Sequence, residues 1–285
     1  MKLDKEIKEQ YQKAYAFATR DQQRDKKIGL STGPVVLEEI LDESMISDKL
    51  DMGILDVPTN MIVGSAHRTE SNALYTKDLL PLFIPSSPYA EQWRKLYAVL
   101  ENEGTFKEEL KCVEYLGKFY VIDGMMRASV AKFSDVPTVK SRVVRVMPVQ
   151  NGSTEVAQYY DFLFDYQLTH LYQLQFTQKG YFSQLQNGLQ RQNSYVWNEA
   201  DRMNFLNYWP KIESAFRKSY GDCLKITAAD ALVVLMKKYT YSQIIHMDLW
   251  VLARVFQAAG RELYALSFPE LAKKETFKTG RLYTA

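Results

Sequence analysis

The sequence predicts an α+β protein in three parts: an N-terminal helical arm over residues 1–50, a mixed domain over 51–149 and an all-α domain over 150–285. Three observations support this prediction. Residues 2–27 have a helix-forming composition, short apolar runs ended by glycine or proline alternate with helical patterns in the middle third, and strand patterns fade after Pro148.

The composition restricts the class of protein. With 285 residues, 46% of them hydrophobic, the chain is long enough for one large domain or two ordinary ones with cores of their own. A net charge of +2 gives no argument for a protein that wraps nucleic acid. Two cysteines and three histidines cannot supply a repeated zinc motif or a disulfide framework, so we expect no protein metal site and a reducing compartment. No window resembles a signal peptide or a membrane span, so we expect a cytoplasmic protein without membrane contact.

The elements of the first 149 residues follow from local signals. Ser87 and Pro88 begin a helix in the favoured way, and Gly104 ends it. Gly117 separates two strand patterns at hairpin spacing. The predicted elements are a helix at 2–27, strands at 54–57 and 61–63, a helix at 88–103, strands at 111–116 and 118–122, a helix at 128–133 and a strand at 138–147.

The helix at 2–27 has a thin apolar stripe, formed by Ile7, Tyr11, Ala14, Tyr15 and Ala18. We interpret it as an amphipathic arm that packs on the body of the protein. A dimer contact is the alternative, and a homodimer is expected from the prevalence of twofold symmetry among oligomers.

The last 136 residues read as helices, followed by a basic, polar tail at 273–285. The segments at 228–239 and 249–256 have the order of a helix-turn-helix motif. The second segment offers Trp250, Val251, Leu252 and Val255, which we interpret as core rather than as side chains that reach base edges. Sequence-specific DNA reading is therefore not predicted, whereas non-specific DNA contact through local basic residues remains open.

One turn has the pattern of a phosphate-binding site: a strand runs into Asp123-Gly124-Met125-Met126-Arg127 and then into a helix. A glycine lets the backbone approach a ligand, the first helical turn leaves N–H groups unbonded, and an arginine one turn later can fork onto phosphate oxygens. An ordinary Asp-Gly turn with a solvated arginine is the alternative. For Asp123 we favour capping of the helix over coordination of Mg2+.

A second strand end has similar residues. The strand at 61–63 runs into Gly64, Ser65, His67 and Arg68, so the two strand ends could converge on one site. His67 could assist a phosphate, although a hydrogen-bonded structural histidine is the favoured interpretation.

This order of elements resembles the ParB/sulfiredoxin-like superfamily. Its members have an early strand that ends at an arginine, then a helix, a hairpin, a D-G-x-x-R or G-x-x-R turn before an alanine-rich helix, and a closing strand. In this chain residues 119–132 and 139–146 match that pattern, and the resemblance covers about residues 52–148. The helical part is more weakly similar to bacterial ParB-like proteins of unassigned role. The resemblance implies a ParB/sulfiredoxin-like domain that binds a nucleoside triphosphate, CTP or ATP with Mg2+. The implied nucleotide-binding residues are Ser65, His67, Arg68, Gly124, Met125, Met126 and Arg127.

The chain also departs from the family. Many relatives have a histidine in the turn, where this chain has Met125 and Met126, and a thioether cannot move protons. Sulfiredoxin has its catalytic cysteine in the turn, but Cys112 and Cys223 lie outside it, so sulfinic-acid reduction is not expected. The departure puts catalysis in doubt and leaves phosphate binding possible.

Three functions follow from these observations. We favour a ParB-like nucleotide-binding protein that is regulatory or DNA-associated. The alternative is an ATP-dependent phosphotransferase of the free-serine-kinase type, in which Glu114 would be the general base and Asp123 would hold the metal. A third is a catalytically inactive adaptor that binds a protein partner through its helical half. Nuclease activity has no carboxylate cluster to support it.

The closing strand is basic, with Lys140, Arg142 and Arg145. We interpret these side chains as a solvated sheet face, with contact to a DNA backbone or an acidic partner as the alternative.

Overall fold

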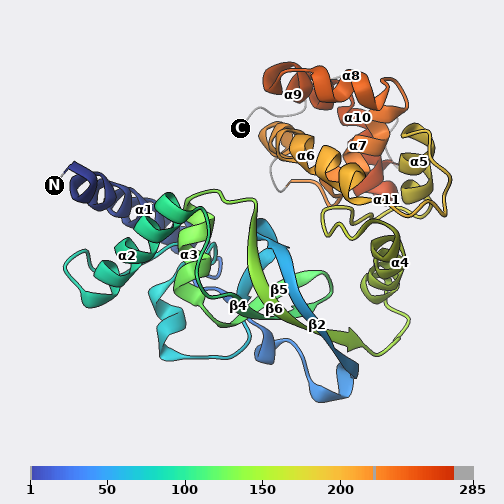
Figure 1. Ribbon diagram of the computed structural model, residues 1–285. Coiled ribbons are helices and arrows are strands. Elements are labelled where there is room, and N and C mark those ends of the chain that lie inside the picture. The colour runs from blue at the N-terminus through green and yellow to red at the C-terminus, as the bar shows by residue number, and fades with distance from the viewer. Residues whose placement is uncertain (1, 221–222, 273–285) are drawn as a thin grey trace. The chain divides into compact units, whose positions relative to one another are not determined.

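The computed structural model describes residues 2–220 and 223–272, and the basic tail at 273–285 lies outside the described residues. The chain is mixed α/β and divides into two compact units, Met1–Ala157 and Gln158–Ala285 (Figure 1). All the described strands belong to the first unit, and the second unit is helical where it is described. This composition is compatible with the predicted α+β class.

The first unit is built on a six-stranded mixed sheet with the order β1-β3-β5-β4-β6-β2. The pairs β1–β3, β3–β5 and β4–β6 are parallel, whereas β4–β5 and β2–β6 are antiparallel. Because β3 and β5 are parallel neighbours, both end at the same edge of the sheet. The strands are β1 (Val35–Val36), β2 (Ile46–Pro58), β3 (Ile62–Ser65), β4 (Leu110–Tyr115), β5 (Lys118–Asp123) and β6 (Thr138–Pro148).

Three α-helices lie wholly within the described part of this unit: α1 (Lys2–Lys27), α2 (Pro88–Glu103) and α3 (Met125–Phe133). The side chain of Ser87 caps α2 by accepting the N–H of Ala90, and Gly104 ends it in the left-handed conformation. The indole of Trp93 is fully buried and donates to the hydroxyl of Ser129 at 3.1 Å, which joins α2 to α3. These contacts hold α3 against α2 beside the end of β5.

The N-terminal helix packs on this core. Tyr11 is buried, its ring meets Trp93 edge-on at 5.2 Å between centroids, and its hydroxyl donates to the carbonyl of Phe83 at 2.6 Å. Ala14 and Ala18 are also fully buried. The predicted packing of this helix on the body of the protein is confirmed, and the dimer contact stays a prediction.

One predicted boundary falls inside a strand, and the observed division between the two units falls inside a helix. The boundary after residue 50 lies within β2, where Leu50 pairs with Arg145 of β6. The predicted arm is α-helical only as far as Lys27 and then supplies β1, two short 3-10 helices (Leu37–Glu39 and Glu43–Met45) and the first five residues of β2. β1 has two residues, too few to show the alternation of apolar and polar residues that indicates a strand. The first half of β2 is largely polar and exposed, because it lies at the edge of the sheet. The second division comes after Ala157, within α4, rather than after residue 149.

The second unit consists of α4 (Thr154–Thr169, which begins in the first unit), α5 (Tyr181–Gly188), α6 (Glu199–Tyr220), α7 (Ala228–Met236), α8 (Tyr241–His246), α9 (Leu249–Ala258), α10 (Gly260–Ser267) and α11 (Pro269–Ala272). Thr227 and Thr240 form capping boxes at the starts of α7 and α8. The buried carboxylate of Asp230 accepts from Thr177 and Thr227 and so ties the segment before α5 to α7. In the part of the chain that the structure describes, no helix is long and apolar enough to cross a membrane.

The prediction that α9 contributes Trp250 and Val251 to the core is wrong. Trp250 is 69% exposed and Val251 is 43% exposed, whereas Leu252 is fully buried. A run of apolar residues extends around more than one side of a helix, and α9 buries only the side that packs against its neighbours. The outer side of α9 therefore presents an indole to solvent.

Candidate functional site

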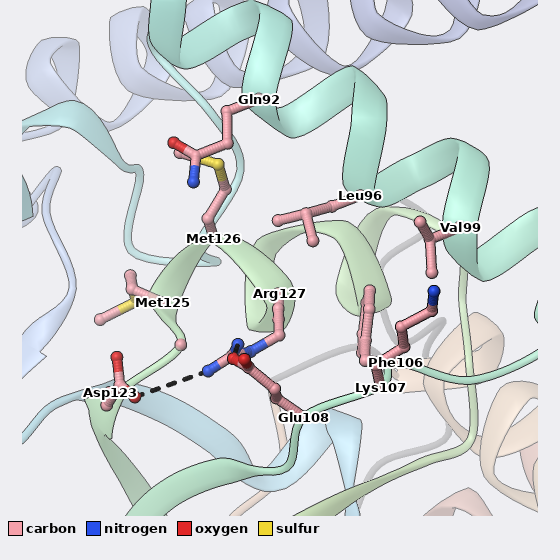
Figure 2. Close-up of a pocket in the computed structure, with 11 residues that line it drawn as sticks. Gln92, Leu96, Val99, Phe106, Lys107, Glu108, Asp123, Met125, Met126 and Arg127 are labelled. Carbon is pink, nitrogen blue, oxygen red and sulfur yellow. Dashed lines mark hydrogen bonds and ion pairs between the residues drawn. The ribbon is translucent and has the colours of Figure 1, made fainter.

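A hollow of about 500 Å³ lies between α2, the segment that follows α2 and the start of α3 (Figure 2). It contains the turn that the sequence indicated, at residues 123–127. The volume lies in the range of small-molecule sites. Its lining consists of Gln92, Leu96 and Val99 from α2, Phe106, Lys107 and Glu108 from the segment before β4, and Asp123, Gly124, Met125, Met126 and Arg127.

Gly124 is the N-cap residue of α3 and has a φ of +99°, a conformation that side chains rarely adopt. A Cβ at this position would lie 2.8 Å from Nη2 and 3.0 Å from Nε of Arg127, so the guanidinium lies directly against the glycine. No side chain caps α3. The helix therefore begins with N–H groups that no capping side chain covers, at the wall of the hollow.

Arg127 is the principal cation of the hollow, and its side chain is only 14% exposed. Its Nη1 donates to Glu108 at 2.7 Å, and its Nη2 lies 3.6 Å from Asp123, the pair that Figure 2 marks with a dashed line. Its buried Nε has no hydrogen-bond acceptor among the described residues. The two carboxylates are 80% and 61% exposed, so water screens both pairs.

Asp123 does not have the capping role that we favoured from the sequence. It lies one residue before the N-cap, and its carboxylate pairs with Arg127 instead of accepting from the first turn of α3. The left-handed conformation of Gly124 separates the carboxylate from the helix it was expected to cap.

Met125 and Met126 line the hollow and are partly buried against the aromatic core around Trp93. Figure 2 shows Met126 beside Gln92 of α2 and Met125 beside Asp123. Their thioethers offer polarisable contact surface but no exchangeable proton. The first turn of α3 therefore contributes packing and backbone donors, without an acid or base of its own.

The residues at the end of β3 do not line the hollow. His67 Nδ1 lies 3.0 Å from Glu38, and the backbone N–H of Arg68 donates to the same carboxylate at 2.6 Å. The Arg68 N–H, and then the His67 ring, lower the pKa of Glu38. The Arg68 guanidinium pairs with Glu39, and the Ser65 hydroxyl donates to the carbonyl of His67 at 2.7 Å.

The expected convergence of the two strand ends is thus not present. Parallel pairing brings β3 and β5 to one edge of the sheet, but Glu38 and Glu39 hold the polar groups of His67 and Arg68 there. The sequence contained no signal for this pairing, because residues 38–39 precede β3 by more than twenty positions.

Glu114 is fully buried and forms an ion pair with Arg145, which faces it across the parallel pair β4–β6. It also accepts the N–H of Gly117 at 2.8 Å. The predicted general base therefore lies outside the hollow, and its hydrogen bond to Gly117 stabilises the turn of the β4–β5 hairpin. Arg145 is 6% exposed, so the expectation of a solvated side chain is wrong for it. Alternation of Glu114 with the buried Leu110 and Cys112 was the signal that it faces the interior.

Sequence reasoning missed half of the lining, namely the residues of α2 and residues 106–108. Leu110 lies against Gly124, so the segment before β4 runs past the start of α3. Only this packing brings Phe106 and Glu108 to the turn.

No protein-family model, curated protein or solved structure matches this chain. Within residues 2–220 and 223–272, no three histidine, cysteine, aspartate or glutamate side chains gather as metal ligands.

Proposed function

We propose that this chain is a ParB-like nucleotide-binding protein, regulatory or DNA-associated, that holds the phosphates of CTP or ATP with Mg2+ at residues 124–127. The observation that supports the proposal most directly is the contact of Gly124 with Arg127: the guanidinium lies where a Cβ on residue 124 would displace it. The contact holds a guanidinium at the uncapped start of α3.

Phosphate fits this arrangement chemically. Backbone N–H groups at a helix start and a guanidinium are both strong donors to phosphate oxygens. The buried Nε of Arg127 has no hydrogen-bond acceptor among the described residues, and an incoming anion would supply one. Glu108, 80% exposed, can move aside at little cost, since exposed ion pairs contribute only about 0–1 kcal/mol.

The opposite wall of the hollow suits the rest of a nucleotide. Leu96, Val99 and Phe106 provide apolar and aromatic surface a short way from the charged turn. A site that combines apolar walls with a few convergent polar groups is typical of small-molecule pockets.

Mg2+ is compatible with the two carboxylates at the turn. Asp123 and Glu108 approach the same guanidinium and offer hard oxygens. Two carboxylates and a triphosphate together carry more negative charge than Arg127 and Lys107 can balance, so a divalent cation would relieve the repulsion. Mg2+ usually takes most of its ligands from phosphates and water, and two protein carboxylates suffice.

Binding without phosphoryl transfer is the function we favour. The phosphotransferase alternative required Glu114 as a base, and that carboxylate is committed to Arg145. Among the residues that line the hollow, Asp123 and Glu108 are the carboxylates, and both pair with Arg127.

Isothermal titration with CTP, ATP, GTP and ADP, each with Mg2+, tests the proposal. We expect one nucleotide to bind, and Arg127→Ala to weaken it by about 1.5–3 kcal/mol, or roughly 10- to 150-fold in Kd. Arg142→Ala is the matched control, because Arg142 also pairs with a glutamate but lies outside the hollow.

Two outcomes would contradict the proposal: no binding of any of the four nucleotides, or equal affinity in a folded Arg127→Ala variant. The first would favour the adaptor function, in which the helical half binds a protein. Arg68→Ala measures whether the end of β3 contributes, and from its pairing with Glu39 we expect a small effect.

A further inference from the structure

The second unit has an exposed aromatic side chain that the nucleotide site does not use. Trp250 on α9 is 69% exposed, the most exposed of the large apolar side chains described. The other tryptophans, Trp93, Trp197 and Trp209, are at most 5% exposed. Keeping one indole in water forgoes the stabilisation that its burial would bring.

Basic side chains flank this indole. The Nζ of Lys218 on α6 lies 5.2 Å from the centroid of the Trp250 ring. Arg254 is exposed one helical turn after Trp250, on the same side of α9. Neither cation forms an ion pair with a carboxylate that the structure describes. We call Lys218, Trp250 and Arg254 the Trp250 surface.

A hydrogen bond between α6 and α9 fixes the positions of the residues in the Trp250 surface. The hydroxyl of Ser219 on α6 donates to the carbonyl of Ala253 on α9 at 2.9 Å, which holds the two helices side by side (Figure 1). Two acidic groups on these helices have partners: Asp248 accepts from the N–H groups of Trp250 and Val251, and Glu213 pairs with Arg217. Among the described residues next to the indole, Lys218 and Arg254 contribute two positive charges against the single negative charge of Asp248.

We propose that the Trp250 surface binds single-stranded DNA, with a base stacked on the free face of the indole and its phosphates held by Lys218 and Arg254. An exposed aromatic ring with cations beside it is the usual platform for unpaired bases, since every base has a π-face and the backbone is anionic. This inference does not depend on nucleotide binding at residues 124–127.

The chemistry of the surface selects this partner. A protein partner generally docks on a contiguous apolar patch, whereas Trp250 has only Val251 as an exposed large apolar neighbour on α9 and has Lys218 and Arg254 beside it. In duplex DNA the base faces are already stacked on one another, so an indole has no ring to cover unless the helix opens. Stacking and phosphate contact do not use the 2′-hydroxyl that distinguishes RNA, so we commit to DNA and make the matching RNA the comparison in the test.

The test is fluorescence anisotropy of the full-length protein with a labelled oligothymidylate at low salt, without added nucleotide. We expect binding, quenching of tryptophan fluorescence, and a roughly 5- to 150-fold loss of affinity in Trp250→Ala. Trp250→Phe keeps a ring and should retain most of the affinity. Lys218→Ala and Arg254→Ala should each reduce the slope of log K against log salt by about 0.7.

Phe164→Ala is the matched control, because Phe164 is similarly exposed, at 65%, on α4. It should bind like the wild type, as should Arg127→Ala, which separates this inference from the nucleotide proposal. No binding to the oligothymidylate, an unchanged affinity in folded Trp250→Ala, or tighter binding to a duplex or to the matching RNA would overturn the proposal.

Discussion

Gly124 and Arg127 are packed so closely that a methyl group on residue 124 would lie 2.8 Å from Nη2 of the arginine. The same glycine has a φ of +99°. The backbone conformation alone disfavours any other residue at position 124, and a Cβ there would also force the guanidinium of Arg127 to shift. The start of α3 and the position of Arg127 are consequently one structural feature.

Substitution of this glycine should have a double effect. In Gly124→Ala the positive φ costs about 1–2 kcal/mol, and the Cβ must also displace the guanidinium. Gly29→Ala is the control, since Gly29 has a φ of +72° but nothing within 4 Å of its Cβ position. We expect a larger loss of unfolding free energy in urea for Gly124→Ala, with weaker nucleotide binding in that variant alone. Equal losses in both variants would show that the contact contributes nothing.

Glu108 should oppose phosphate binding when no metal is present. Glu108→Gln removes a negative charge 2.7 Å from the Arg127 guanidinium and frees that group for phosphate. Titration without Mg2+ should therefore give tighter nucleotide binding, by up to about 5-fold, the size of an exposed ion pair. Glu109→Gln, whose carboxylate pairs with Arg142 outside the hollow, should show no change. Weaker binding in Glu108→Gln without metal would contradict this role.

The buried pair of Glu114 and Arg145 should affect stability rather than chemistry. Glu114→Gln leaves a buried arginine without its countercharge and should lower the free energy of unfolding by about 3–5 kcal/mol in urea denaturation. The double variant Glu114→Leu/Arg145→Met removes both charges and should recover most of that loss. A stable Glu114→Gln protein with altered nucleotide affinity would instead place Glu114 in the site.

Asp165 on α4 should make stability depend on pH. Burial, and then the charge of Asp161, raises the pKa of Asp165 from 3.8 to about 7. Between these values the folded chain binds more protons than the unfolded one, so the unfolding free energy falls as pH rises and levels off above about pH 7. Asp165→Asn removes this loss.

Thermal unfolding at pH 5 and pH 8 measures the effect. The gain in Tm of Asp165→Asn over the wild type should be larger at pH 8 than at pH 5. Asp161→Asn should give a smaller gain in the same direction, because burial is the larger cause of the raised pKa. An Asp165→Asn gain that is equal at both pH values would contradict the raised pKa.

Local sequence signals predicted most of the elements that frame the hollow. Pro88 and Gly104 indicated the two ends of α2, Gly117 indicated the turn of the β4–β5 hairpin, and Gly124 indicated the turn before α3. The structure has the corresponding helix end or turn at each of these positions. Each signal is a preference of one residue for a particular φ or capping position, which acts within a few neighbours. They were missing for β1, which is two residues long, and for the polar half of β2.

The partners of the charged side chains could not be predicted in this way. Arg68 was expected to bind nucleotide, Glu114 to act as a base and Asp123 to cap a helix or hold a metal, and they pair with Glu39, Arg145 and Arg127. Such pairs form between segments that are far apart in the chain or turned by a special backbone conformation. Trp250 was assigned to the core for the same reason, since a periodic pattern does not tell which side of a helix its neighbours cover.

The sequence by itself determined the succession of helices and strands and the position of a glycine–arginine turn between β5 and α3, because these depend on short-range backbone preferences and side-chain periodicity. Only the tertiary structure decided that α2 and residues 106–108 complete the hollow, that Glu38 and Glu39 hold the end of β3, and that an indole remains exposed on α9. These features depend on sheet order and helix packing, in which the energy of each contact is shared by residues distant in the chain.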